Sequence, residues 1–514
     1  MMDIDLKLRV SDAIGRRDFV LAESLCRQAE GHIGEPDLLL IRGVVYCAQG
    51  DLDKARAALA RAHQALPERA DIAYNYGVIL QQCGRMADAV EAWSKATACA
   101  PQNAAAWVNL ALATQQLGET EAAAAVYRKA LTHHPTHRDL LYNYANLLFR
   151  SGELEASESH YRRLLESHRN DAAAAINYAK LLKSAGRFAE SEACYRQAIA
   201  SGDRANLAQA HFNLANLLLL QGRWKEGFAA YEWRLTLADG TRAPWRLPNW
   251  TPALKPGSRV LLWNDQGQGD AIMFLRFASL LGGYRLFAFV QDSLKALAAT
   301  APGIEAAFGP ADAPQAMDAS LPLCSLPHAL GLDSIDVWNG PYLSAPQHCA
   351  APFADRAGMG RRIGLVWAGN PKHANDAHRS MRLMDFAPLF ALPDIEWVSL
   401  QVGERVCELL TSPYRERVRD LSPCLADFSA TASVIKQLDL VISIDSAPAH
   451  LAGALGTPVW TLLPAIDTDW RWQSAGETTP WYPTMRLFRQ PRPLDWGSVV
   501  AAMADALRAG RALR

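Results

Sequence analysis

A stretch near the carboxyl end of the chain, residues 438–460 (LDLVISIDSAPAHLAGALGTPVW), has the residue types expected of an anion-binding site. An apolar run leads into Asp445 and Ser446, and a helix of small residues follows. Ser446 is a good N-cap, Pro448 suits the first helical turn, and Gly456 suits the residue after a helix. The unpaired N–H groups and the positive dipole end of such a helix attract phosphate. We therefore expect a phosphate-bearing ligand here, although an ordinary strand–helix connection would show the same pattern.

A second cluster with catalytic potential is DQGQGD, residues 265–270. Its glycines allow close backbone approach, and Asp270 stands where a helix would begin. A hydroxyl group is a poor nucleophile unless a base takes its proton, which a carboxylate can do. Asp270 is our candidate general base and Asp265 is the alternative, while a simple helix-capping role for Asp270 is the competing interpretation. The segment lacks the third glycine of a dinucleotide fingerprint, which disfavours a redox enzyme.

Basic residues follow the apolar segment RRIGLVWAGN, residues 361–370. Lys372, His373 and Arg379 could neutralise a leaving diphosphate, a task that many enzymes give to a metal ion. His373 would serve equally well as a solvated loop residue. The DTD segment at 467–469 resembles a metal-binding Asp-x-Asp, but two alternating carboxylates are common by chance, so we expect no metal site.

Strands that alternate with short helices must position these residues. Such an order predicts two parallel sheets, and parallel sheets bind ligands at the carboxyl ends of their strands. The expected strands are RVLLWN, RLFAFVQ, AAFG, DASLPLC and GPYLSA in a first lobe, and RRIGLVWAGN, IEWVSLQ, RVRDLS, LDLVISID and TPVWTLLP in a second.

The amino-terminal half has a different architecture. Only 2 of the 15 tryptophans precede residue 224, and only 4 of the 28 prolines precede residue 206. Glycine recurs every 34 residues from Gly50 to Gly186, with a small residue seven positions before each one, and Gly15 and Gly222 extend the series with spacings of 35 and 36. Glycine suits the turn inside a helix–turn–helix unit, and small residues let two helices approach closely. The pattern resembles the tetratricopeptide repeat and predicts six to seven stacked units.

Asparagine shares this period. Asn75, Asn109, Asn143 and Asn177 are 34 residues apart, and Asn213 continues the series. One interpretation is a shared hydrogen bond to the neighbouring helix. The other is a ladder of amides on the concave face that binds the main chain of an extended peptide. Such a ladder resembles that of the O-linked N-acetylglucosamine transferases, where it holds the acceptor polypeptide.

Composition narrows the class of protein. The 514 residues carry a net charge of −1, which gives no global attraction to nucleic acid. The start of the chain lacks the features of a signal peptide, and no apolar run is long enough to span a bilayer. Nine scattered cysteines suggest a reduced, cytoplasmic setting. We predict repeats over 1–235, a proline-rich linker over 236–257, and two lobes over 258–355 and 356–514.

Several segments together carry a family resemblance. ISIDSAPAHLAGALGTPVWTLL, RIGLVWAGNPKHANDAHRSM with the later SLQ (399–401), and DWRWQSAGETTPWYPTMRLFRQPRP are similar to the heptosyltransferase-like (family 9) glycosyltransferases. Bacterial proteins that fuse tetratricopeptide repeats to this domain are the best likeness, and some of them glycosylate flagellin. The resemblance implies a GT-B fold, in which two Rossmann-like lobes face a cleft, a nucleotide-sugar donor that acts as a co-substrate without a further cofactor, and inversion at the anomeric carbon.

The resemblance also implies roles for single residues. Asp270 matches the family's first-lobe carboxylate, and Asp445 and His450 match an acid and a histidine near the donor. Arg379 matches best the position of the family's phosphate-binding cation, and Lys372 is the second choice. Ser446 and the amides of Ala447 and Ala449 would face phosphate, and SLQ would lie near the base. A buried, satisfied histidine is the competing interpretation for His450.

We therefore predict an inverting, metal-independent glycosyltransferase that moves a sugar to a serine or threonine of a protein, possibly flagellin, presented in the groove of the repeats. An interaction scaffold with a degenerate transferase domain is one alternative. A transferase for polysaccharide or lipid-linked acceptors is the other.

Overall fold

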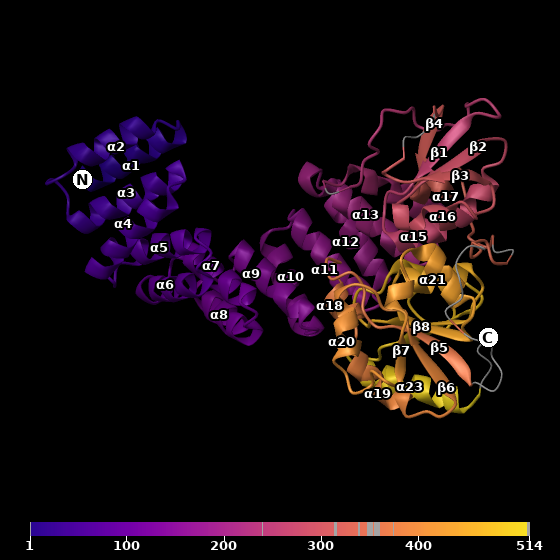
Figure 1. Ribbon diagram of the computed structural model, residues 1–514. Helices are drawn as coiled ribbons and strands as arrows, with labels where there is room; N and C mark the ends of the chain where they lie inside the picture. Colours follow the sequence, from indigo (N-terminus) through magenta and orange to yellow (C-terminus); the bar gives the residue numbers. More distant parts are fainter. Residues whose placement is uncertain are drawn as a thin grey trace. The chain divides into compact units, whose positions relative to one another are not determined.

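The computed structural model describes residues 2–238, 240–312, 316–337, 340–346, 353, 360–373 and 375–510. The chain forms two compact units, Met1–Asn177 and Tyr178–Arg514 (Figure 1). The first unit is entirely helical in its described part. The second contains further helices and two parallel sheets, so the predicted order of a repeat array followed by an α/β region is confirmed.

The first unit consists of successive helix pairs. Adjacent helices pack through alanine, leucine and aromatic side chains, as in the core around Trp93, Trp107 and Tyr127. The helices are α1 (Met2–Gly15), α2 (Phe19–Gln28), α3 (Glu35–Gln49), α4 (Leu52–Ala65), α5 (Ala70–Gln82), α6 (Met86–Cys99), α7 (Ala104–Gln116), α8 (Thr120–His133), α9 (Arg138–Arg150), α10 (Leu154–Ser167) and the start of α11 (Ala172–Ser184).

The periodic glycines occupy the turns inside the helix pairs, as predicted. Gly50 has φ +81° and Gly84 has φ +74°, a left-handed conformation that glycine adopts without strain. Gly77 is the small residue seven positions before Gly84. A side chain there would approach Trp93 to 2.6 Å, which explains why this position is small. The first pair departs from the series, because Gly15 is the last residue of α1 and the left-handed residue of that turn is Arg17.

The helix pairs continue into the second unit and contact its first sheet. Their helices are the rest of α11, α12 (Phe188–Ala200), α13 (Arg204–Leu220), α14 (Trp224–Tyr231) and η1 (Glu232–Thr236). Arg234 of η1 is buried, and its Nε lies 2.6 Å from Oδ2 of Asp265, which follows the first strand. Phe228 and Tyr231 also contact Trp470, which belongs to the lobe of the second sheet, so these helices pack on both lobes.

The first sheet has four parallel strands in the order β3-β2-β1-β4. The predicted linker packs on it, since Trp245 contacts Phe289 edge-to-face and Trp250 N–H donates to the Ser320 carbonyl oxygen. The elements are β1 (Arg259–Trp263), α15 (Gln268–Phe274), η2 (Leu275–Leu280), β2 (Arg285–Phe289), η3 (Asp292–Leu294), α16 (Lys295–Ala298), β3 (Ile304–Phe308), β4 (Ala319–Pro322), η4 (Leu323–Ser325) and α17 (Leu326–Ala329).

The strand predicted at GPYLSA is wrong. Residues 340–346 form no strand, and the N–H of Tyr342 donates instead to the carbonyl oxygen of Ala454 near the second sheet. The Tyr342 hydroxyl donates to the Ile272 carbonyl oxygen in α15, so this segment links the two lobes. A short apolar run can serve a lobe interface as well as a sheet, which is why its pattern misled the prediction.

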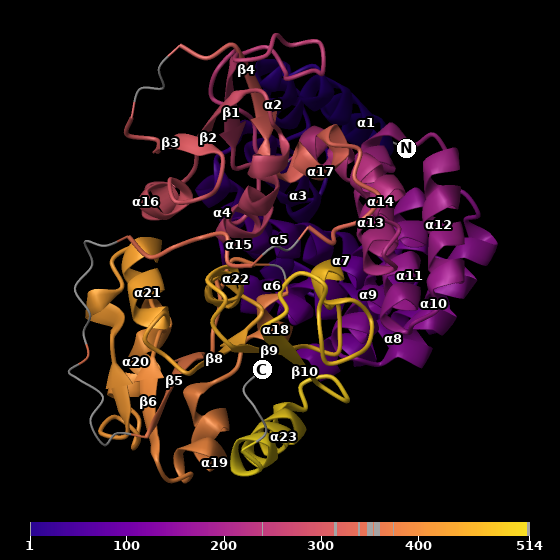
Figure 2. The same ribbon diagram turned by 90° about the vertical axis from the view of Figure 1, so that its right-hand side faces the viewer.

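The second sheet has six parallel strands in the order β10-β9-β8-β5-β6-β7. β10 was not predicted. Leu440 and Ile442 of β8 pack toward α19 and α23, which lie side by side (Figures 1 and 2), while Val441 faces the core that contains α22. The strands are β5 (Arg361–Val366), β6 (Ile395–Ser399), β7 (Val418–Asp420), β8 (Leu440–Ile444), β9 (Val459–Leu463) and β10 (Met485–Arg489).

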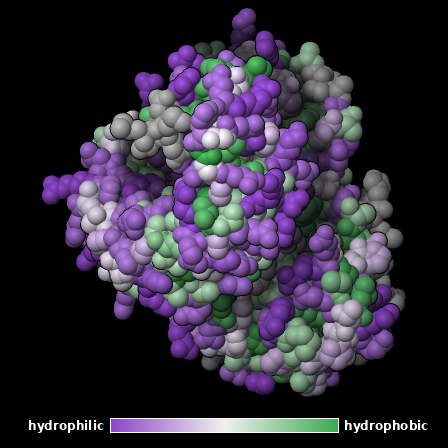
Figure 3. All heavy atoms as spheres, turned by 90° about the vertical axis from the view of Figure 1, so that its left-hand side faces the viewer, coloured by the Kyte–Doolittle hydropathy of each residue, from purple (hydrophilic) through white to green (hydrophobic). Residues whose placement is uncertain are grey.

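Short helices connect these strands, and a longer one ends the described chain. They are α18 (Asp376–Arg379), η5 (Leu383–Phe386), α19 (Ala387–Phe390), η6 (Glu404–Val406), α20 (Cys407–Leu410), η7 (Ser422–Cys424), α21 (Phe428–Ile435), α22 (Ala447–Ala454), η8 (Trp470–Trp472) and α23 (Trp496–Arg508). The face of the molecule in Figure 3 is mostly hydrophilic, with hydrophobic side chains in small groups. Among the described residues, the helices lack the combined length and apolar character that crossing a bilayer requires.

Candidate active site

A cavity of about 1090 Å³ in the second unit lies where strands of both sheets end. Its walls come from loops that follow β1, β2, β5, β6, β8 and β9, from the start of α21, and from the helices α11 to α14. Of the predicted site residues, the cavity brings together Asp270, Arg379, Asp445, Ser446, Ala447, His450 and Asn213.

The amino end of α22 forms part of the wall, directly after the buried strand β8. Ser446 precedes the helix and Pro448 lies in its first turn, as predicted. The Ser446 hydroxyl does not cap the helix, because its Oγ lies 2.9 Å from the Ser443 Oγ instead. The Ala449 amide, which was expected to face phosphate, donates to the Ser446 carbonyl oxygen at 3.0 Å. Ala447 therefore retains the cavity-facing role that Ala449 lacks.

Arg379 reaches the same end of the cavity from α18. Its Nη1 donates to the carbonyl oxygen of Asp445 at 3.1 Å, and its Nε to Asp376 at 3.3 Å. A side chain on Gly369 would approach Arg379 Nη2 to 2.6 Å, so this glycine makes room for the guanidinium. Burial, reinforced by the negative charge of Asp469, raises the pKa of Asp445 above its usual range. A cation and a helix amino end thus lie beside one acidic side chain that holds its proton more tightly than usual.

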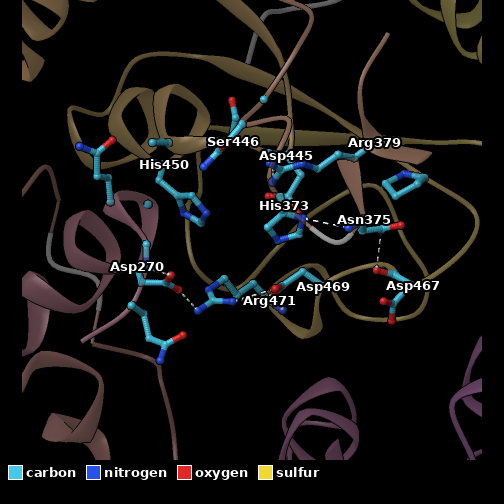
Figure 4. Close-up of a pocket in the computed structure, with 18 of the residues that line it drawn as sticks. Asp270, His373, Asn375, Arg379, Asp445, Ser446, His450, Asp467, Asp469 and Arg471 are labelled. Atoms are coloured by element: carbon cyan, nitrogen blue, oxygen red, sulfur yellow. Dashed lines mark hydrogen bonds and ion pairs between the residues drawn. The ribbon is translucent and has the colours of Figure 1, made fainter. Parts of the chain in front are cut away.

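Asp270 lies in the first turn of α15, on the side of the first sheet. Its Oδ2 accepts the Gly267 N–H at 2.9 Å, so Asp270 does cap the start of α15. Its Oδ1 forms an ion pair with Arg471, which comes from η8 after β9 (Figure 4). Burial raises the pKa of Asp270, and the Arg471 charge opposes that shift. A carboxylate with a raised pKa on a cavity wall has the properties of a general base.

The carboxylate and the cation that were second choices, Asp265 and Lys372, both lie off the cavity wall. Asp265, the alternative base, is 1% exposed and accepts hydrogen bonds from Arg234 and from the Cys324 N–H, so it stabilises the attachment of η1. Lys372 is exposed and is not part of the wall, whereas its neighbour His373 is.

Arg471 is a central residue of the cavity that the sequence interpretation missed. Its Nη1 binds both carboxylate oxygens of Asp469, at 2.8 and 2.9 Å, in addition to the ion pair with Asp270. Its guanidinium lies 4.3 Å from the centre of the Trp470 ring. The segment DWRW belonged to the stretch that resembled the family, and a charged residue between two tryptophans was the available signal.

His450 lies one turn into α22 and is 5% exposed. Its Nδ1 is 3.0 Å from the Tyr482 hydroxyl, and its ring stacks on Trp472. Burial, with a smaller contribution from Arg471, lowers the pKa of His450 to about 3, so the ring is neutral at physiological pH. A side chain on Gly269 would approach His450 Cδ2 to 2.9 Å, which shows that this glycine allows α15 and α22 to meet.

Repeat-type helices supply a further wall of the cavity. Lys180 and Lys183 of α11 line it, and Lys183 Nζ lies 3.0 Å from Asp467 in the loop after β9. Asn213 of α13 is 7% exposed, and its Oδ1 accepts a hydrogen bond from Gln209. Its Nδ2 has no acceptor among the described residues. The wall therefore includes a buried amide donor.

The other four asparagines of the predicted ladder belong to the first unit. Asn177 Nδ2 donates to the Tyr142 hydroxyl and to Asn146 in α9, which fits the interpretation of a bond between neighbouring helices. Asn75 donates to the carbonyl oxygen of Asp71 in its own helix. In the described part of the chain, Asn109 and Asn143 are half-buried and have no such partner.

The SLQ segment ends β6 beside the cavity. The Gln401 side chain accepts the N–H groups of Trp367 and Ala368 through Oε1 and donates to the Ala368 and Val402 carbonyl oxygens through Nε2. Gln401 therefore fastens the ends of β5 and β6 together, and the backbone after it lines the cavity.

Comparison with family models agrees with this geometry. The model for glycosyltransferase family 9 (heptosyltransferase) matches residues 403–483, which include α22 and Arg471. One tetratricopeptide repeat model matches residues 46–113 and 115–181, and a second matches residues 177–233. The chain joins tetratricopeptide repeats to a family 9 glycosyltransferase domain. Asp270 and Arg379 lie outside the matched part of that domain.

Similar proteins cover parts of the chain. It is 27% identical over 342 residues to Protein FlbA of Caulobacter vibrioides, which covers 60% of this chain and 56% of that protein. The chain thus spans little more than half the length of this curated relative.

Solved structures are similar to part of the chain. Pseudomonas aeruginosa pilF is 20% identical, with 40% of this chain and 90% of that one covered and a TM-score of 0.34. The C-terminal part of a TPR repeat-containing protein from Cytophaga hutchinsonii is 15% identical, with 45% and 95% covered and a TM-score of 0.38.

Proposed function

We propose that this protein transfers a sugar from a nucleotide-sugar to a serine or threonine hydroxyl of a protein. The observation that carries the proposal is that one cavity brings a candidate base, Asp270, to the same walls as Arg379 and the amino end of α22. Repeat-type helices line this cavity as well, which supports a polypeptide acceptor. The family 9 match supports the class of reaction.

In this reaction the acceptor oxygen attacks the anomeric carbon as Asp270 takes the hydroxyl proton. The bond between the anomeric carbon and the diphosphate oxygen breaks, and the nucleoside diphosphate leaves with the electron pair. Arg379 and the Ala447 amide are placed to stabilise the charge that develops on that oxygen. Positioning matters because a weakly nucleophilic hydroxyl gains most from being held in line with the bond that breaks.

Two finer features belong to the same proposal. A base on the first lobe, opposite the phosphate-binding residues of the second, fits a single displacement with inversion at the anomeric carbon. Arg379 fits a mechanism in which a protein cation, without a metal or further cofactor, stabilises the leaving group. Flagellin is the candidate acceptor because the resembling bacterial fusion proteins include transferases that modify it.

The donor half is tested by calorimetric titration of the full chain with UDP, GDP, ADP and CDP, with CMP as the monophosphate comparison. We expect one diphosphate to bind, and the corresponding nucleotide-sugars to be hydrolysed slowly when no acceptor is present. Absence of binding across this panel would contradict the proposed donor site and favour an interaction scaffold.

The acceptor half is tested with the double variant Asn109→Ala/Asn143→Ala, because these two amides have no partner within the described residues. We expect weaker glycosylation of a flagellin acceptor with unchanged donor hydrolysis. The matched control is Asn177→Ala, whose amide is occupied by α9 side chains. Unchanged protein glycosylation in the double variant would argue against the ladder, and activity toward only polysaccharide or lipid-linked acceptors would replace the protein acceptor.

A further inference from the structure

We propose that Arg471 is the positioning residue of the active site, which orients the Asp270 carboxylate for proton abstraction. This inference rests on the proposed function and adds a residue that acts through the base. It explains why an arginine of the second lobe pairs with a carboxylate of the first.

The hydrogen bonds of Asp270 define one orientation of its carboxylate. Oδ2 accepts the Gly267 N–H at 2.9 Å, and Oδ1 pairs with Arg471 Nη2. With one partner on each oxygen, rotation about the Cβ–Cγ bond is blocked. The side chain remains 21% exposed toward the cavity, so a lone pair is available to an acceptor hydroxyl. Without Arg471, the Gly267 bond would be the one left to this carboxylate among the described residues.

Arg471 is itself held rigidly. Asp469 accepts its backbone N–H at 2.9 Å and both hydrogen bonds from Nη1, and the Trp470 ring covers the guanidinium plane. The residue is 5% exposed. A planar guanidinium fixed on several sides loses little further freedom when it orients a partner, which a flexible surface arginine could not achieve.

The same contacts argue against a phosphate-binding role for Arg471. Two carboxylates already surround it, so the local charge of the three groups is negative when all are ionised. Arg379 has one longer carboxylate contact, to Asp376 at 3.3 Å, and otherwise binds a carbonyl oxygen. Of these two arginines, Arg379 is therefore the one with charge to offer a diphosphate.

The electrostatics of Asp270 agree with this role. Burial raises its pKa and the Arg471 guanidinium counteracts that rise, so removing the guanidinium raises the pKa further. A base acts only when deprotonated, and the acidic limb of the rate profile would then move to higher pH. The titratable groups that face Asp270 are Arg471, Asp469, Asp265, Tyr231, Cys324 and, across Gly269, the neutral His450.

The experiment measures hydrolysis of the nucleotide-sugar that the full chain uses, over a series of pH values, for Arg471→Gln and Arg471→Lys. The matched control is Arg486→Gln, which removes an arginine that pairs with Glu477 away from the cavity. We expect Arg471→Gln to slow hydrolysis about 10- to 100-fold, as expected for a misplaced catalytic group. The acidic limb of the pH–rate profile should shift to higher pH, while diphosphate affinity should be unchanged. Arg471→Lys should restore part of the rate.

Three results would overturn the role of Arg471. Wild-type rates in Arg471→Gln would do so, and so would a loss of diphosphate affinity with an unmoved pH profile, which would make Arg471 a phosphate ligand. If Arg471→Gln fails to fold, Asp469→Asn/Arg471→Gln removes the opposing charges together, and a wild-type profile in that variant would again contradict the role. A wild-type chain that neither binds nor hydrolyses any donor would instead remove the proposed function, and the role of Arg471 with it.

Discussion

The two sheets of the second unit contribute unequally to the cavity. The four-stranded sheet supplies the loop after β1, with Asp270, and one residue after β2, Gln291. The six-stranded sheet supplies loops after β5, β6, β8 and β9, with the helix amino end and all the arginines of the wall. One sheet therefore offers a single carboxylate, whereas the other offers most of the surface a ligand would contact.

This difference separates chemistry from binding. A residue of the first sheet should govern how fast a reaction proceeds, and residues of the second should govern how tightly a nucleotide binds. The separation is incomplete, because Asp270 is oriented by Arg471 and α15 packs against α22 through Gly269. Variants in the residues of each sheet test whether rate and affinity are separated in this way.

The largest effect is expected for Asp270→Asn. An amide cannot take the acceptor proton, so the transfer rate should fall by about 10²- to 10⁴-fold, the usual contribution of a general base. Diphosphate affinity, measured by calorimetry, should stay within error of wild type. A parallel loss of diphosphate affinity would contradict the separation of rate from binding, because the first sheet would then bind the donor as well.

Arg379→Ala should give the next largest effect, on binding. Loss of a charge-assisted hydrogen bond to phosphate should weaken diphosphate affinity by about 10- to 100-fold. Arg382→Ala is the matched control, since Arg382 is an exposed arginine of the same segment that pairs with Asp385. Equal affinities of the two variants would show that the phosphate site lies elsewhere.

Gly269→Ala should have a smaller effect, on the contact between the two lobes. The new methyl group would meet His450 at 2.9 Å and should destabilise the second unit by about 1–3 kcal/mol through overpacking. Urea unfolding followed by tryptophan fluorescence measures the change. Gly282→Ala, where no atom lies within 4 Å of the added Cβ, should leave stability nearly unchanged. Similar midpoints for the two variants would mean that the lobes separate easily.

The smallest effect concerns pH. His450 has a folded-state pKa of about 3, and an unfolded histidine titrates near 6.5, so unfolding takes up a proton between these values. The free energy of unfolding is therefore not reduced by His450 at neutral pH. As the pH falls below about 6, protonation of His450 in the unfolded chain lowers it by about 1.4 kcal/mol per pH unit. Unfolding midpoints at about pH 7.5 and about pH 5.5 should differ less in His450→Gln than in wild type.

The exposed His32 supplies the control for this pH dependence. His32→Gln should keep the wild-type difference between the two midpoints. If His450→Gln kept it too, the buried imidazole would not account for the loss of stability in acid.

Much of the fold was predictable because it depends on local patterns. The 34-residue glycine period predicted the helix pairs, and apolar runs between turn residues predicted β1 to β9. The exceptions are informative. Residues 340–346 have the composition of a strand but contact Ala454, and β10 was hidden within MRLFRQ, where arginines alternate with apolar residues. Both depend on what lies opposite in space, which a local pattern does not contain.

The site was predictable in part for the same reason. The strand–helix junction at Asp445 and Ser446 is local, so its position at a cavity followed from the sequence. The preference for Asp270 came from its place at a helix start, which is a local signal. The reason to set Asp265 aside is not local, because Asp265 is buried in an ion pair with the distant Arg234. The resemblance favoured Arg379 over Lys372, and of the two the structure places Arg379 on the cavity wall, where Gly369 makes room for its guanidinium.

The sequence by itself determined the repeat array, the two parallel sheets and the helix end suited to phosphate, because periodicity and turn chemistry act over a few neighbouring residues. Only the tertiary structure decided that Arg471 meets Asp270, 201 positions apart in the chain, and that α11 and α13 line the cavity. Buried charges must find partners wherever the fold brings them, and that matching is a property of the packed molecule.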